Sequence, residues 1–132
     1  MVKKTIKYTD FNEVEREENF YFNLSIQELI AMERDDPSGS LAKRLEGLVK
    51  TENVFDILEF VEWIVRKAYG VRTEDGRGFR KSEEETEAFI QSAAYDEFYL
   101  SFLEDPEGAA EFINSLMPKK LPKGMTLEAL PS

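Results

Sequence analysis

The sequence contains no cysteine and no histidine. The first absence excludes disulfides and thiolate sites, and the second removes the commonest general base and transition-metal ligand in proteins. The uncharged apolar stretches are much shorter than a membrane span, and Lys3 and Lys4 are followed by a strand-like alternation rather than by a signal peptide. We therefore expect a cytoplasmic protein with no cofactor, no metal and no contact with a membrane.

Basic residues are scarce relative to acidic ones, and the net charge is -10. Residues 66–81 carry six Lys/Arg against two acids, whereas residues 82–117 carry ten acids and no base. Such a balance repels phosphates, so we expect no binding to nucleic acid. The acidic run is either a solvated helical face or a surface that pairs with a basic partner. The basic block at residues 66–81 and the acidic block at residues 82–117 also suit self-association through head-to-tail contact between identical copies.

Carboxylates are abundant, but none is arranged as a catalytic site. Paired carboxylates can hydrolyse glycosides or hold Mg²⁺, yet no pair is set apart by its spacing. The glycine-rich stretch at residues 75–78 lacks the Lys-Ser/Thr ending of a phosphate loop. The sequence therefore predicts a protein that is not an enzyme.

The first 24 residues have the pattern of a β-hairpin. Residues 3–9 alternate, residues 10–13 are turn formers, and residues 14–22 return with β-branched and aromatic side chains. Ser25 and Glu28 then fit a capping box, which predicts a helix start.

Helical patterns dominate the rest of the chain. Caps and apolar spacing predict helices at residues 26–33, 41–50, 54–69 (ended by Gly70), 83–104 (with a bend near Ser92) and 106–116. Residues 71–81 contain an Asp-Gly pair and two glycines, which predicts a loop. The fold class is therefore α+β and mainly α-helical. We expect a single domain over residues 1–117, with its helical part at 25–117, and a flexible C-terminal tail at 118–132, where prolines disfavour regular structure.

Two of these helices carry more apolar surface than one core-facing side needs. In residues 54–69, one stripe suits a core, but Phe55, Phe60 and Trp63 fall outside it. Such a helix is either sandwiched in a core or used at an interface. Trp63 is the first interface candidate, because tryptophan often anchors protein contacts.

The expected helix at residues 83–104 shows the same excess, with apolar residues over more than half of its circumference. It is either a central buried helix or a face that receives an apolar partner segment. On the second interpretation its contact residues are Phe98, Tyr99 and Phe102.

Several short segments also carry a family resemblance. They are YTDFN at 8–12, EREE at 15–18, FYFNLS at 20–25, AYG at 68–70, EDGRGF at 74–79, FIQSAAY at 89–95 and AAEFIN at 109–114. Together they resemble the tail assembly chaperones of long-tailed (siphovirus-type) bacteriophages. The resemblance implies a non-enzymatic protein of the host cytoplasm, absent from the mature virion. Such a protein binds the tape measure protein, keeps it soluble and helps to recruit the major tail (tube) protein.

Two further hypotheses concern the gene and the function. The family often makes a longer product by frameshifting, and Lys119-Lys120 could be encoded by a slippery site. The alternative function is an acidic inhibitor or decoy that mimics nucleic acid, which would need the acids of residues 82–117 on one exposed face.

Overall fold

The computed structural model describes residues 1–36 and 40–117 of the 132-residue chain. The predicted tail at 118–132, with Lys119-Lys120, lies outside these residues.

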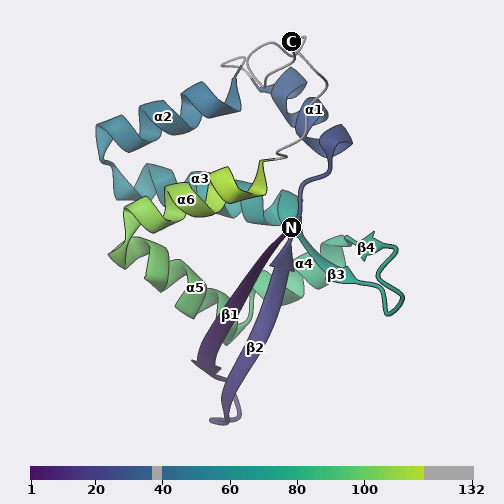
Figure 1. Cartoon of the computed structure of the whole chain (residues 1–132). Coiled ribbons are helices and arrows are strands. Elements are labelled where there is room, and N and C mark those ends of the chain that lie inside the picture. Colours follow the sequence, from purple (N-terminus) through teal and green to yellow (C-terminus); the bar gives the residue numbers. More distant parts are fainter. Residues whose placement is uncertain (37–39, 118–132) are drawn as a thin grey trace.

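The N-terminal hairpin is confirmed: β1 (Val2–Thr9) pairs antiparallel with β2 (Glu15–Phe22) (Figure 1). The turn is closed by the Asp10 carboxylate, which accepts hydrogen bonds from the backbone N–H groups of Asn12 and Val14.

The predicted loop at residues 71–81 was wrong in part, because it contains a second hairpin. β3 (Tyr69–Arg72) pairs with β4 (Phe79–Arg80), and β3 also adds to β2, so the sheet order is β1-β2-β3-β4. Asp-Gly is a hairpin-turn signal as well as a loop signal, and Gly76 has the positive φ of 75° that such turns use. Pairing of Tyr69 and Gly70 with Phe22 and Tyr21 of β2 organises this segment as a strand.

Gly70 does not end the preceding helix, as the sequence suggested, but lies within β3. A Cβ at this position would be 2.5 Å from the Phe79 ring and 2.7 Å from the backbone oxygen of Arg80. The glycine is therefore required for the close approach of β4.

The helical part of the fold is also confirmed, except that the single helix expected at residues 83–104 is two helices. Among the described residues the helices are α1 (Ile26–Asp35), α2 (Leu41–Thr51), α3 (Val54–Ala68), α4 (Glu83–Ile90), α5 (Ala93–Glu104) and α6 (Pro106–Leu116). The expected bend near Ser92 is a full break. The Ser92 hydroxyl donates to the Phe89 carbonyl and accepts from the Tyr95 N–H, so it begins a new helix.

The core joins the hairpin to the helices. The fully buried ring of Phe22 stacks on Phe98 with a centroid distance of 5.4 Å and meets Phe112 edge-on at 5.2 Å. α3 packs against α2, α5 and α6, and its predicted apolar stripe faces this core. Just after β2, the backbone N–H of Asn23 donates to the Ala68 carbonyl over 2.9 Å, which joins the end of β2 to the end of α3.

Candidate protein-binding face

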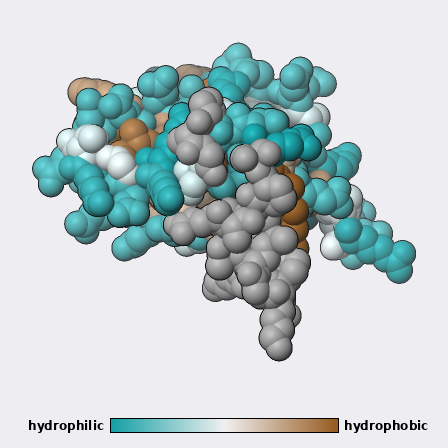
Figure 2. All heavy atoms as spheres, turned by 90° about the horizontal axis from the view of Figure 1, so that it is seen from above, coloured by the Kyte–Doolittle hydropathy of each residue, from teal (hydrophilic) through white to brown (hydrophobic). Residues whose placement is uncertain are grey.

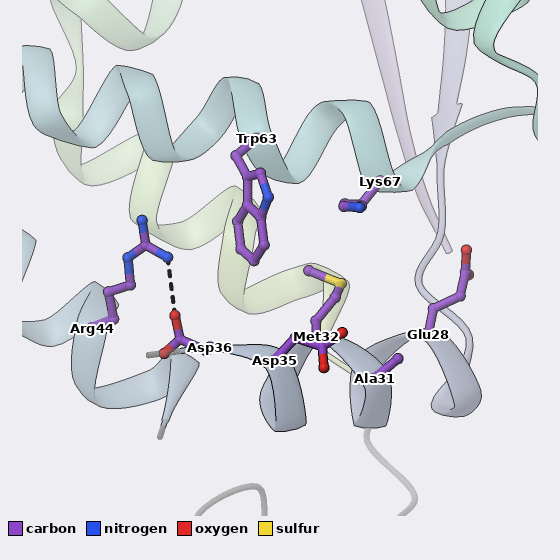
Figure 3. Close-up of a pocket in the computed structure, with 8 residues that line it drawn as sticks. All are labelled: Glu28, Ala31, Met32, Asp35, Asp36, Arg44, Trp63 and Lys67. Atoms are coloured by element: carbon purple, nitrogen blue, oxygen red, sulfur yellow. Dashed lines mark hydrogen bonds and ion pairs between the residues drawn. The ribbon is translucent and has the colours of Figure 1, made fainter. Parts of the chain in front are cut away.

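Trp63 lies half-buried where three helices meet. Figure 3 shows its indole ring directed from α3 toward α1 and α2, between Arg44 and Lys67. The ring stacks on Phe60 at a centroid distance of 5.6 Å. The Arg44 guanidinium lies 5.4 Å from the centre of the Trp63 ring and 4.8 Å from that of Phe60, within the range of a cation–π contact.

A hollow opens beside this ring. Its lining residues, which we call the Trp63 face, are Glu28, Ala31, Met32, Asp35, Asp36, Arg44, Trp63 and Lys67. Arg44 is held in place by an ion pair of 3.1 Å with the buried carboxylate of Asp36. Met32 brings a flexible apolar side chain close to Trp63 (Figure 3). The face thus combines an apolar floor with charged walls of both signs.

A second hollow continues from the Trp63 face toward α4. It shares Glu28, Trp63 and Lys67 with the first and is otherwise lined by Arg66 and by residues 81–83, 86 and 87. Trp63 therefore has open space on both sides along α3. A concave surface with a central tryptophan and a flanking arginine has the composition of a protein-contact site.

A family model described as phage tail assembly chaperone matches residues 1–130. The chain belongs to the phage tail assembly chaperone family. No curated protein and no solved structure matches it. The resemblance noted in the sequence is thereby confirmed, and the family places this chaperone in the assembly of a phage tail, with tail proteins in general as its partners.

The predicted contact residues of this tail assembly chaperone divide into two groups. Phe60, Phe98 and Phe102 are buried in the core, where contact with a partner would require the core to open. The other three reach the surface: Phe55 is 71% exposed, Tyr99 is 37% exposed, and Trp63 is half-buried. The sequence did not single out Met32, Arg44 or Lys67, because only the packing of α1 and α2 on α3 brings them to Trp63.

The charge blocks of the chaperone partly pair with each other inside the chain. Arg66 forms an ion pair with Glu87, and Arg80 approaches Glu85 at 4.0 Å. Lys67, on the Trp63 face, makes no ion pair with any described residue. Its ammonium group is therefore available beside the tryptophan to pair with a partner's carboxylate, as far as the described residues go.

Figure 2 shows the chaperone from above, and among the coloured residues of that view hydrophilic side chains dominate while apolar ones form small separate areas. In the described ranges, no group of three or more acidic side chains is placed to hold a metal ion. No helix of the described part is long and apolar enough to cross a membrane.

Proposed function

We propose that this chain binds the tape measure protein of its phage through the Trp63 face and keeps it soluble while major tail (tube) subunits are recruited. The action is reversible burial of apolar segments and needs no catalysis. On this proposal the protein works in the cytoplasm of the bacterial host and is left out of the mature virion.

The observation that carries the proposal is the half-buried Trp63 with Met32 close to it and Arg44 against its ring. A partner helix that covers this hollow would remove apolar surface from water, and tryptophan and arginine commonly dominate such contacts. The net charge of -10 supports the same role, because it would keep a complex with an apolar partner in solution.

The test is co-expression with the tape measure protein of the same phage, followed by size exclusion with light scattering. We expect a soluble complex that contains several copies of this chain and survives high salt, because apolar contacts are not screened. Trp63→Ala should send the tape measure protein to the pellet. Ala31→Arg, which fills the hollow without removing a core side chain, should do the same.

The matched control is Phe11→Ala, since Phe11 is an exposed aromatic residue in the hairpin turn, away from the Trp63 face. Circular dichroism must show all variants folded. The proposal is wrong if the wild-type chain leaves the tape measure protein insoluble. It is also wrong if folded Trp63→Ala and Ala31→Arg both hold that protein as well as Phe11→Ala does.

Phe55 and Tyr99 belong to the same proposal as secondary contacts. They lie on α3 and α5, which pack against each other, and both are exposed. Light scattering of the free chain tests self-association at the same time. A mass that falls to that of the monomer with rising salt would identify pairing between the basic and acidic blocks of neighbouring copies.

A further inference from the structure

β2 is paired along its full length on one side only. All eight residues of Glu15–Phe22 face β1, whereas β3 pairs only with Tyr21 and Phe22. No other strand of the described residues pairs with residues 15–20. Figure 1 shows this half of β2 with no strand on the side away from β1. We call residues 15–19 the open edge.

The backbone of the open edge presents donors and acceptors that the described ladders do not use. The Asp10 N–H donates to the Val14 carbonyl over 2.9 Å, which makes this pair a hydrogen-bonded one. Such pairs alternate along an antiparallel ladder, so Arg16 and Glu18 direct their backbone groups toward β1. Glu15, Glu17 and Asn19 therefore direct theirs outward, where an added strand could meet them.

The second hairpin pairs with β2 only outside the open edge. β3 leaves β2 after Gly70, and a hollow lies between Asn19 and the β3–β4 residues Arg72 and Thr73. The Arg72 guanidinium lies 4.0 Å from the centre of the Tyr21 ring and donates to its hydroxyl over 3.0 Å. This contact joins β3 to the paired end of β2, whereas Glu15 and Glu17 lie further along β2, past the last residue that pairs with β3.

The charges of the open edge determine which kind of strand can pair with it. Glu15, Glu17 and Glu18 are all exposed. Two open edges paired with each other would bring glutamates together, which disfavours self-pairing. The strand that β2 already accepts is β1, in which Lys7 is the partner of Glu17. A strand with basic residues at alternate positions would be complementary in the same way.

We propose that the open edge of β2 binds an extended segment of a protein partner that carries Lys or Arg at alternate positions, as an added β-strand. This interaction is separate from the Trp63 face and goes beyond the function proposed above. It would give the chaperone a second contact, made mainly by the backbone and tuned by charge.

The probe is a synthetic peptide with the sequence of β1 in which Lys4 and Thr5 are exchanged, VKTKIKYT, so that its lysines stand at alternate positions. It is added to the full-length ¹⁵N-labelled protein at low salt. We expect chemical-shift changes and slowed hydrogen exchange at the backbone amides of Glu15, Glu17 and Asn19.

The decisive pair of variants is Glu17→Pro and Glu17→Ala. Both remove the same charge, but only proline removes the outward N–H, and it spares the ladder with β1. Glu17→Pro should bind the peptide roughly tenfold more weakly than Glu17→Ala.

Three controls complete the test. Trp63→Ala should bind the peptide like the wild type, which separates this proposal from the previous one. A peptide with its lysines replaced by glutamate should not bind. The NMR spectrum of Glu17→Pro must retain the β1 amide signals of the folded hairpin.

The proposal is overturned if the three amides do not respond at a saturating peptide concentration, or if folded Glu17→Pro and Glu17→Ala bind equally. It is also overturned if these amides are already protected in the free protein. Protection that grows with protein concentration would assign the edge to a second copy, and protection independent of concentration would assign it to residues 118–132 of the same chain.

Discussion

The ammonium group of Lys81 lies 2.7 Å from both carboxylate oxygens of Glu28. It also donates hydrogen bonds to the backbone carbonyls of Asn23 and Lys67. One side chain thus joins the segment after β4 to the end of β2, the first turn of α1 and the end of α3. Glu28 accepts the Ser25 N–H as well, so the capping box of α1 is part of the same network.

We expect Lys81→Met to lower the free energy of unfolding by about 1–3 kcal/mol, because it leaves a partly buried carboxylate without its cation and two carbonyls without a donor. Urea unfolding measures this change. The control is Lys67→Met. The Lys67 side chain is exposed at the end of α3, so this substitution should change the free energy of unfolding by less than about 0.5 kcal/mol. Equal effects of the two substitutions would contradict a structural role of the ion pair.

The same pair predicts a loss of stability in acid. Burial alone raises the pKa of Glu28, but hydrogen bonds from Lys81 and Ser25 outweigh it and bring the pKa below its ordinary value of 4.5. A lowered pKa in the folded state stabilises the protein above pH 4.5, and this contribution is lost as the pH falls through the folded-state pKa. Urea unfolding across this acid range should therefore show a smaller decrease in Lys81→Met than in the wild type.

Glu33 should act in the opposite direction. Its buried carboxylate accepts the Leu41 N–H over 2.8 Å, but its second oxygen has no hydrogen-bond partner in the described structure. Burial raises the pKa of Glu33, and the nearby Asp36 adds to this effect. The folded state then holds the proton more tightly, so stability should fall as the pH rises from 4.5 through the folded-state pKa. Glu33→Gln should remove this slope from the unfolding data, and an unchanged slope would assign it to another group.

Two glycines give a matched pair for backbone packing. Gly70→Ala places a Cβ against Phe79 and the Arg80 backbone, and we expect it to cost about 1–3 kcal/mol. Gly47 lies in α2, where an added Cβ would meet no atom within 4 Å apart from the backbone of its own helix. Gly47→Ala should therefore stabilise the protein by about 0.5–1 kcal/mol. Thermal unfolding compares the two, and a similar sign for both would refute the close approach of β4.

Phe22 and Phe55 provide the corresponding test of the core. Phe22→Ala should destabilise the protein by about 3–5 kcal/mol, because the ring is fully buried and contacts Phe98 and Phe112. Phe55→Ala should change stability by less than about 0.5 kcal/mol, since the side chain is largely exposed. A strong destabilisation by Phe55→Ala would mean that its ring is part of the core in solution.

Sequence reasoning was most successful where the signal is local. The hairpin of β1 and β2, the Ser25–Glu28 capping box and the core stripe of α3 were all predicted correctly. It was less successful for the second hairpin and for Gly70. An Asp-Gly pair is compatible with both a loop and a turn, and the choice was made by the pairing of Tyr69 with Phe22, far apart in the sequence.

At the Trp63 face, too, the sequence predicted one residue correctly and another wrongly. The helical wheel put Trp63 outside the core stripe, and the ring is indeed half-buried at the surface. The wheel put Phe60 there too, but Phe60 is buried against Trp63 and Arg44. A helical wheel describes one helix and does not include α2, whose Arg44 covers this side of α3.

By itself, the sequence determined the fold class, most helix ends and the family of this protein, because caps, apolar periods and family motifs are properties of neighbouring residues. Only the tertiary structure decided which aromatic rings stay accessible, that Lys81 pairs with Glu28, and which part of β2 remains unpaired among the described strands. These features depend on contacts between distant segments. Their free energy comes from the packing of whole elements, and no local pattern of residues specifies it.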